Sequence, residues 1–272
     1  MYSQEEKCRI QNFAKDIRIE TLKEFAHLGF GHLGGAMSMV EILSVLYGDE
    51  LKHDPSNPRW ELRDRLVCSK GHSGPSLYAT LALRGYFPLE MLLTLNEGGT
   101  NLPSHCDMIK TPGIDFTTGS LGQGLSIASG SAYAQKLKGV NARVFCIVGD
   151  GELQEGQNWE AIMFAAHKEL NNLIVFVDYN KMQLDGSLES INDISPLDEK
   201  FSAFGWHVEN VDGHDISQIK NAIVAAKEVC NKPTVVVCNT IKGKGVNWAE
   251  NEWNHHINVT HELADEAITA LG

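Results

Sequence analysis

The pattern with the clearest chemical content is an aspartate between two glycines, with an asparagine thirty residues later. The GDG segment at 149–151 directly follows the apolar run 143–148, and Asn180 follows the next apolar run, 173–177. Such runs predict neighbouring parallel strands, whose carboxyl ends meet at one edge of a sheet. GDG alone is more typical of an ordinary turn than of a binding site. With Asn180 in register, Asp150 instead predicts a site where hard oxygen ligands bind a divalent cation and glycine N–H groups bind phosphate.

Histidines in irregular, mostly glycine-rich segments form a second group of candidates. The chain has eleven histidines, and each is by default an ordinary surface or core residue. His32 lies in GHLGG, His72 in SKGHSGP and His105 in PSHCD, while His255 and His256 lie in a late loop. Such segments bring side chains close to a ligand, and imidazole both donates and accepts hydrogen bonds near neutral pH. We therefore expect a role for these histidines in a binding or catalytic site.

The elements that must position these residues alternate between helix and strand. Ile10, Phe13, Ala14 and Ile17 have the spacing of an amphipathic helix. Ser38 and Glu41 resemble a capping box that opens a helix over 39–47. Strands are expected at 65–69, 143–148, 173–177, 205–211 and 233–238, with helices between them. The pattern predicts the α/β class, a parallel sheet flanked by helices on both faces, in a single domain over residues 1–272.

Composition narrows the classes of partner and compartment. The net charge of −12 argues against nucleic acid as a main partner. The longest apolar stretch, 161–166, is far shorter than the about 20 residues of a membrane-spanning helix, and the polar N-terminus lacks the apolar core of a signal peptide. The six cysteines form no CxxC pair. We expect a cytoplasmic protein that binds neither nucleic acid nor membrane.

Five segments in order resemble one known family. GDGELQEGQNWEA with NLIVFVDYNKMQLDG is similar to the thiamine-diphosphate signature in its transketolase form. GHLGGAMSMVEILSVLY, RDRLVCSKGHSGPSLYATLALRGYF, PGIDFTTGSLGQGLSIASGSA and IKGKGV resemble further segments of the transketolase N-terminal domain. The resemblance implies the diphosphate-binding (PP-type) fold and a two-carbon ketol transfer from a ketose to an aldose, with thiamine diphosphate as cofactor.

The resemblance also implies a role for each candidate residue. The divalent cation, Mg²⁺ with Ca²⁺ or Mn²⁺ as alternatives, would be held by the side chains of Asp150 and Asn180 and the carbonyl of Met182. The cofactor would further contact His72, Gly119, Leu121, Gly151 and Lys242. The donor hydroxyls would meet His32, His105 and one histidine of the late loop.

Two places in the sequence depart from the family pattern. Related sequences place the loop histidine directly after the tryptophan, whereas Trp253 is followed here by Asn254, so His255 and His256 both remain candidates, with spacing favouring His256. Cys106 replaces the usual proline after His105.

Glu155 fits either the helix-dipole preference for early acids or, by resemblance, a proton-relaying network at a subunit interface. The Gly-, Ser- and Ala-rich helix after TTGSLGQG would also suit such an interface.

By resemblance, the activating glutamate would belong to a second, pyrimidine-binding domain, which we do not expect within these 272 residues. The resemblance therefore implies a split transketolase, completed by a separate C-terminal pyrimidine-binding subunit in an α2β2 heterotetramer. Sugar phosphates are the expected substrates, with a sulfosugar or branched sugar phosphate as alternatives. Two competing hypotheses are another thiamine-diphosphate enzyme, such as a 2-oxo-acid dehydrogenase subunit, and a non-catalytic homologue. Another thiamine-diphosphate enzyme should lack the TTGSLGQG and KGHSGP segments. A non-catalytic homologue would not need Asp150, Asn180 and the histidines.

Overall fold

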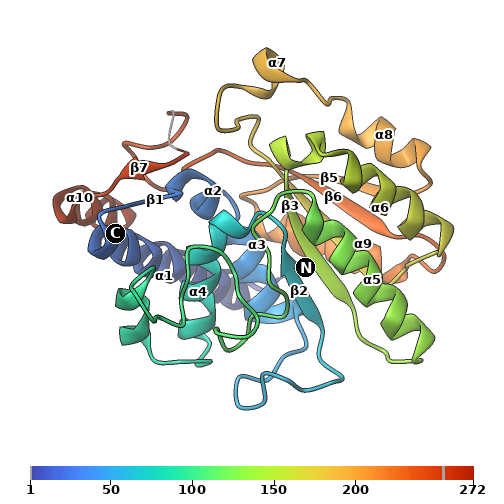
Figure 1. The fold of residues 1–272 in the computed structure, drawn as a ribbon, viewed down its shortest axis with the longest axis horizontal. Coiled ribbons are helices and arrows are strands. Elements are labelled where there is room, and N and C mark those ends of the chain that lie inside the picture. Colours follow the sequence, from blue (N-terminus) through green and yellow to red (C-terminus); the bar gives the residue numbers. More distant parts are fainter. Residues whose placement is uncertain (1, 253–254) are drawn as a thin grey trace.

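A five-stranded parallel sheet forms the centre of the molecule (Figure 1). The structure is a computed structural model that describes residues 2–252 and 255–272. The strand order is β2-β3-β4-β6-β5. The strands are β2(Arg65–Cys68), β3(Val144–Gly149), β4(Leu173–Tyr179), β5(His207–Asp212) and β6(Thr234–Asn239). The predicted strands are therefore confirmed to within two residues at each end, and so is the parallel sheet.

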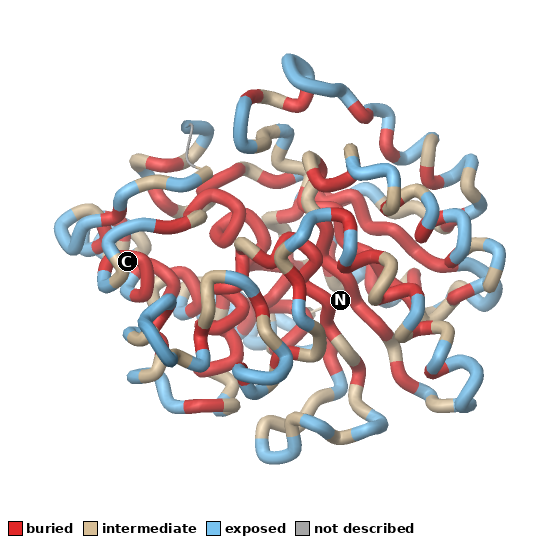
Figure 2. The backbone as a smooth tube through the Cα atoms, in the orientation of Figure 1, coloured by how far each residue is buried: buried red, intermediate tan, exposed pale blue. Residues whose placement is uncertain are grey.

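Alternate residues of each central strand pack on opposite layers of helices. In β3, Phe145 and Ile147 belong to the core on one face, whereas Val144, Cys146 and Val148 belong to the core on the other. The first layer contains α1(Gln4–Leu28), α3(Val40–Val45), α4(Gly74–Leu83), α9(Ile216–Glu228) and α10(His261–Leu271). The second contains α5(Gln123–Leu137), α6(Gly156–His167) and α8(Leu197–Ala203). Figure 2 shows both layers buried where they face the sheet, which confirms helices on both faces.

Helix α1 shows how local sequence fixes an element. Ser3 and Glu6 form a reciprocal capping box at its start, and Gly29, with φ +88°, ends it in the left-handed conformation. Ile10 and Ile17 are fully buried, as the predicted amphipathic spacing requires. The helix therefore lies with one face against the core.

The segment after α1 differs from its prediction. A short helix, α2(Leu33–Ser38), precedes α3, and a π-helical turn, η1(Leu46–Glu50), follows α3. The predicted capping box is wrong, because both of its side chains bind distant residues. The Ser38 hydroxyl donates to Asp178 Oδ2 at 2.6 Å, and Glu41 forms a buried ion pair with Arg18 at 2.7 Å. Tertiary partners override the local cap here.

Short elements join the layers around the carboxyl edge of the sheet. Strand β1(Phe30–Gly31) pairs antiparallel with β7(Ile257–Asn258), so the segment before His32 lies beside the end of the late loop. The remaining short helices are η2(Gly71–Ser73), η4(Gly151–Gln154) and α7(Leu188–Ile191), and η3(Leu89–Thr94), which packs against α1 and α4. Among the described residues, no helix combines the length and apolar character that crossing a membrane requires.

Candidate functional site

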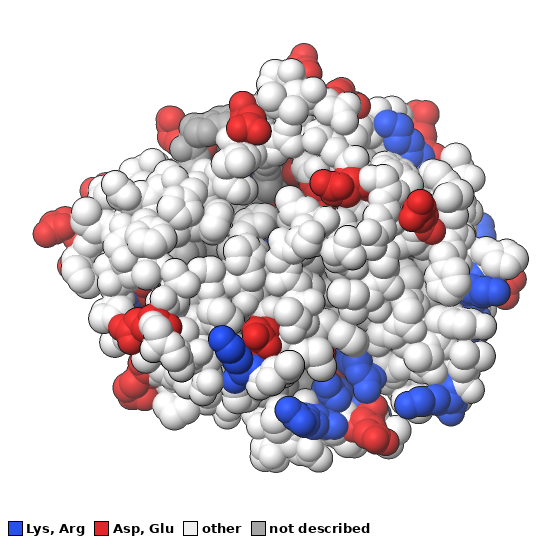
Figure 3. Space-filling view, viewed as in Figure 1, with Lys and Arg blue, Asp and Glu red and all other residues white. Residues whose placement is uncertain are grey.

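A cavity of about 180 Å³ opens at the carboxyl edge of β3 and β4. Figure 3 shows a hollow in the upper part of the molecular surface in this view, between α2 and the loop that leads to α7. Eight of the predicted site residues line the cavity: His72, Leu121, Asp150, Gly151, Asn180, Met182, Lys242 and His255. The parallel register pairs Gly149 with Asp178, which brings the two strand ends together as predicted.

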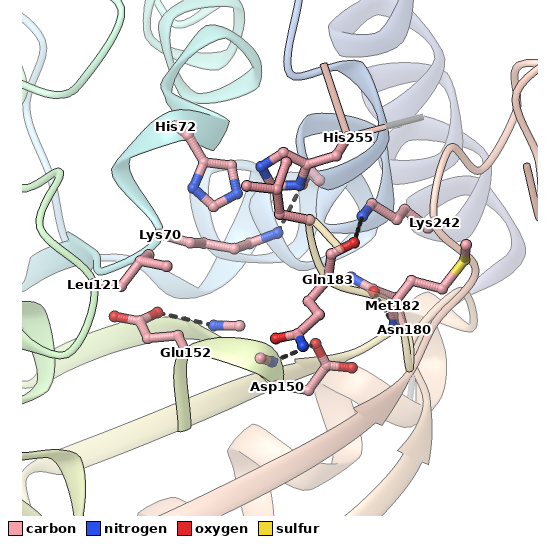
Figure 4. Close-up of a pocket in the computed structure, with 14 residues that line it drawn as sticks. Lys70, His72, Leu121, Asp150, Glu152, Asn180, Met182, Gln183, Lys242 and His255 are labelled. Atoms are coloured by element: carbon pink, nitrogen blue, oxygen red, sulfur yellow. Dashed lines mark hydrogen bonds between the residues drawn. The ribbon is translucent and has the colours of Figure 1, made fainter. Parts of the chain in front are cut away.

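Asp150 is buried at the bottom of this cavity, only 2% exposed (Figure 4). Its carboxylate accepts hydrogen bonds from the backbone N–H groups of Gly151 at 2.7 Å and Lys181 at 2.5 Å. Burial and the neighbouring Asp178 nevertheless raise the pKa of Asp150 to about 7. A carboxylate whose charge is so poorly compensated is a suitable ligand for a cation.

Asn180 and Met182 supply the other two predicted ligand positions. The Asn180 Oδ1 accepts from the Met182 N–H at 3.1 Å, and its Nδ2 donates to Asp178 Oδ2 at 3.1 Å. The amide oxygen is thereby fixed on the side away from Asp178. Within residues 2–252 and 255–272, no group of three histidine, cysteine or acidic side chains could hold a metal ion. A cation here would need a mixed set of carboxylate, amide and carbonyl oxygens completed by the diphosphate, and this set fits Mg²⁺.

A buried network next to the cavity was missed by sequence reasoning. We use "floor" for Asp178, Lys70, Ser38 and Thr240, of which Lys70 alone lines the cavity. The Lys70 ammonium lies 2.5 Å from Asp178 Oδ2 and donates to the Gly35 carbonyl at 2.7 Å. Thr240 Oγ1 donates to Asp178 Oδ1 at 2.5 Å. Burial alone would raise the pKa of Asp178, but the ion pair with Lys70 and the two hydroxyl donors lower it.

Glu152 is a second buried acid that was not predicted. Its carboxylate accepts from the N–H groups of Gly149 at 3.0 Å and Gly122 at 2.9 Å, and from the Ser69 hydroxyl. Burial raises its pKa. The side chain ties the loop that carries Leu121 to the end of β3, so it fixes one wall of the cavity.

Lys242 enters the cavity from the loop after β6. It is 4% exposed, and its ammonium lies 3.4 Å from the Gln183 carbonyl (Figure 4). Burial lowers the pKa of Lys242 to about 8. Its position opposite Asp150 gives the cavity a cationic side, which suits an anionic ligand.

The predicted histidines gather above the floor. We use "histidine rim" for His32, His72, His105, His255 and His256. The ring centroid of His32 lies 5.3 Å from that of His72, 6.3 Å from His105, 5.2 Å from His255 and 4.9 Å from His256. The rings of His72 and His255 are 5.2 Å apart. Both candidates of the late loop therefore reach the site.

Burial keeps the inner histidines neutral. It lowers the pKa of His32 to about 4, with further lowering by His256 and His105, and the pKa of His255 to about 4, with further lowering by Lys242. Burial and Lys70 hold the pKa of His72 well below its usual value. A neutral imidazole can both donate to and accept from a hydroxyl group, so these rings suit a polyhydroxylated ligand.

The remaining predicted residues lie at or outside the edge of the site. His105 is exposed, and a Cβ placed on Gly119 would lie 3.2 Å from its ring, so Gly119 lets these two loops approach. Glu155 is also exposed; it is the residue before α6, packs next to Gly122, and does not line the cavity. The landmark Trp253 lies outside the described residues.

One sequence signal for the missed residues was available. Asp178 is a charged residue within the otherwise apolar β4 and is fully buried, which demands a partner. Lys70 follows β2, whose neighbours in the sheet do not include β4. The pair therefore required the observed strand order before it could be identified.

Comparison with known proteins assigns the chain to a family. The family described as "Transketolase, thiamine diphosphate binding domain" matches residues 10–271. The 6-deoxy-6-sulfo-D-fructose transketolase subunit SqwG of Clostridium sp. is 51% identical over 98% of both chains. One of the apulose-4-phosphate transketolase subunits, from Actinobacillus succinogenes, is 41% identical over 84% of this chain and 83% of its own length.

Solved structures agree in fold. A transketolase variant from Pichia stipitis, in complex with fructose 6-phosphate, superposes with a TM-score of 0.91 at 31% identity. The match covers 97% of this chain, which spans only 40% of that protein. The transketolase of Campylobacter jejuni superposes with a TM-score of 0.86 at 31% identity, over 99% of this chain and 43% of its own. The chain belongs to the transketolase family, as an N-terminal, thiamine-diphosphate-binding subunit of a transketolase.

Proposed function

We propose that the chain binds the diphosphate–metal end of thiamine diphosphate in a split transketolase that transfers a two-carbon ketol unit from a ketose to an aldose. The observation that carries this proposal is the cavity shared by Asp150, Asn180, Met182 and Lys242. It combines oxygen ligands for a divalent cation with a buried ammonium group. That combination matches a metal diphosphate better than an uncharged ligand.

Within this proposal, Asp150, Asn180 and the Met182 carbonyl hold Mg²⁺, for which Ca²⁺ or Mn²⁺ could substitute. Lys242, His72 and the Gly151 N–H bind the diphosphate. The backbones of Gly119 and Leu121 contact the rest of the cofactor. Thiamine diphosphate, when bound, supplies the carbon nucleophile and the electron sink that ketol transfer requires.

His32, His105 and a histidine of the late loop would bind the donor sugar. In the net reaction, the C2–C3 bond of the ketose breaks, its C3 hydroxyl loses a proton, and a new bond joins C2 to the aldehyde carbon of the acceptor, whose oxygen gains a proton. His32 and His105 are placed to exchange hydrogen bonds with the donor hydroxyls. His256 packs on His32 and Phe30, which supports a donor role, whereas His255 packs on both His32 and His72 and so lies between the proposed donor and cofactor histidines.

A separate chain would complete the active site. The chain spans about two fifths of the solved transketolases, and two similar relatives are named as subunits. We infer that the partner is a pyrimidine-binding C-terminal subunit and that the assembly is α2β2, with exposed Glu155 and the small residues of α5 at the interface. All six cysteines are free, which fits the expected cytoplasmic location.

The donor is proposed to be a sulfonated ketose. The relative named for 6-deoxy-6-sulfo-D-fructose shares 51% of its residues with this chain, against 41% for the relative named for apulose 4-phosphate. Ordinary sugar phosphates, such as fructose 6-phosphate and xylulose 5-phosphate, are the comparison substrates.

The test is a ketol-transfer assay of the purified chain, alone and mixed with a candidate pyrimidine-binding subunit, with each donor in turn. We expect no turnover by the chain alone, turnover by the mixture, and the highest kcat/KM for the sulfonated ketose. A mass measurement of the complex tests the two-plus-two stoichiometry. Turnover by the chain in isolation would contradict the split architecture, and preference for fructose 6-phosphate would contradict the donor.

A further inference from the structure

The loop that carries Lys242 is held on both sides of this residue. Before it, the Ile241 N–H donates to His214 Nε2 at 2.8 Å. After it, the Gly243 N–H donates to the Gly34 carbonyl at 3.0 Å, and the Lys244 carbonyl accepts from Arg18 Nε at 2.9 Å. These contacts leave the backbone at Lys242 little freedom.

The side chains that hold this loop are joined through one buried acid. Glu41 lies at 2.7 Å from Arg18 Nη1, accepts from Arg18 Nη2 at 2.9 Å, and lies 3.0 Å from His214 Nδ1. Burial would raise the pKa of Glu41, but the ion pair with Arg18 and the bond to His214 lower it to about 2. The carboxylate is therefore ionised, and it connects α1, α3 and the turn before α9.

The hydrogen bonds determine the tautomer of His214. Its Nε2 faces the Ile241 N–H, which can only donate, so Nε2 must be the acceptor. Its Nδ1 then carries the proton and donates to Glu41. Each ring nitrogen therefore has one distinct partner.

The glycine that follows Lys244 packs closely on Arg18. Gly245 has φ +84°, and a Cβ placed on it would lie 2.6 Å from Arg18 Nε. Any side chain at this position would displace the guanidinium from the Lys244 carbonyl. The close packing on Arg18 thus requires glycine here.

We propose that Arg18, Glu41 and His214 are positioning residues that fix the backbone around Lys242 and so direct its ammonium group into the cavity. This proposal rests on the proposed function, in which that group binds the diphosphate. None of the three residues lines the cavity itself. They would act on the ligand through Lys242 alone, so substituting them should have no effect on ligand affinity once the Lys242 side chain has been removed.

Amide isosteres separate the two bonds of His214. His214→Gln can place an acceptor near Nε2 for Ile241, whereas His214→Asn keeps a donor near Nδ1 for Glu41 and leaves Ile241 without a partner. His207→Asn is the matched control, because His207 bonds the neighbouring side chain of Glu209 on edge strand β5. Calorimetric titration of thiamine diphosphate at saturating Mg²⁺, on the complex with its partner, gives the Kd of each variant.

We expect His214→Asn to raise the Kd about tenfold, as the loss of one hydrogen bond to a buried group predicts, and His214→Gln to change it by less than about threefold. Combined with Lys242→Ala, His214→Asn should have no further effect, because two residues that act through one contact are not additive. Equal weakening in both backgrounds, or equal weakening by both isosteres, would overturn the proposal.

Hydrogen exchange of the cofactor-free chain separates this proposal from the proposed function. His214→Asn should accelerate exchange in residues 240–246 and leave β6 unchanged, and His214→Gln should match the original chain. Unchanged exchange in 240–246 would refute the positioning role even if the cofactor binds. Failure of the unmutated complex to bind thiamine diphosphate would refute the proposed function instead. If His214→Asn does not fold, Gly245→Ala tests the same positioning role from the other side of Lys242, because it disturbs the bond between Arg18 and the Lys244 carbonyl.

Discussion

The floor of the cavity and the histidine rim lie side by side but are constructed differently. In the floor, Asp178 is fully buried, and its carboxylate meets one ammonium, two hydroxyls and one amide. In the rim, ring centroids lie 4.9–6.3 Å from His32, while His105 and His256 are exposed. The floor is saturated with internal partners, whereas the rim still offers hydrogen-bonding groups to a ligand.

The difference indicates a division of labour. A saturated floor keeps its geometry whatever is bound, which suits a support for the proposed diphosphate and metal site. A rim of neutral, partly exposed imidazoles can adapt its donors and acceptors to different sugars. Asp150 lies at the boundary: it is as buried as the floor, but its carboxylate meets backbone N–H groups where Asp178 meets an ammonium.

The largest effect is expected at Asp150, the proposed metal ligand at the bottom of the cavity. Asp150→Ala removes the only charged protein ligand proposed for the cation, so the affinity for thiamine diphosphate with Mg²⁺ should fall by more than about a hundredfold. The melting temperature of the cofactor-free chain should not fall, because the removed carboxylate is poorly compensated. Calorimetric titration of the complex and thermal unfolding measure the two effects. Asp185→Ala, at an exposed position in the next loop, is the control. Unchanged affinity would remove Asp150 from the site.

Substitutions in the floor should lower the free energy of unfolding of the chain. Asp178→Ala leaves the Lys70 ammonium buried without its carboxylate, which typically costs about 3–5 kcal/mol. Denaturant unfolding of the cofactor-free chain measures this loss. Adding Lys70→Met should recover much of it, since the unpaired charge is then gone. If the single and double variants are equally unstable, the ion pair does not explain the floor.

Substitutions in the histidine rim should affect cofactor binding and use of the donor separately. His105→Ala should lower kcat/KM for the donor about ten- to a hundredfold with little change in cofactor affinity, the usual effect of one lost hydrogen bond in a polar site. His72→Ala, which lines the cavity beside Lys70, should weaken the cofactor by a similar factor. Steady-state kinetics and cofactor titration of the assembled complex distinguish the two. Identical phenotypes would show that the rim acts as a single unit.

The smallest effect concerns acid stability. The pKa values of His32 and His255 are lowered to about 4 in the folded chain, below the unfolded value of about 6.5. The unfolded state therefore takes up protons first, and stability is lost as the pH falls from about 6.5 towards 4. The double variant His32→Asn, His255→Asn should reduce this loss by a few degrees in melting temperature. Melting curves between pH 7 and 4 are the measurement, and an unchanged slope would contradict the buried neutral state.

The sequence predicted the parts of the site that follow directly from strand ends. Asp150 and Asn180 each come just after an apolar run, so a parallel sheet was enough to bring them together. The histidines were found because they lie in irregular loops. By contrast, the pair of Asp178 and Lys70 spans 108 positions and depends on which strands are neighbours.

Local patterns failed where distant partners compete. Ser38 and Glu41 have the spacing of a capping box, but Asp178 and Arg18 bind them instead. A buried carboxylate or guanidinium gains more from a polar side chain than a helix end exposed to water does. Sequence spacing carries no information about that competition.

The two-residue ladder between β1 and β7 has a consequence for folding order. Gly31 pairs with Ile257, 226 positions later, so the segments that carry His32 and His256 meet only after nearly the whole chain is available. Contacts of such high sequence separation form late, because a long loop must close first. With only two pairs of residues to hold it, this ladder should also be among the first parts to open locally. The histidine rim would then be assembled last during synthesis and released first in native-state fluctuations, while the sheet beneath it remains folded.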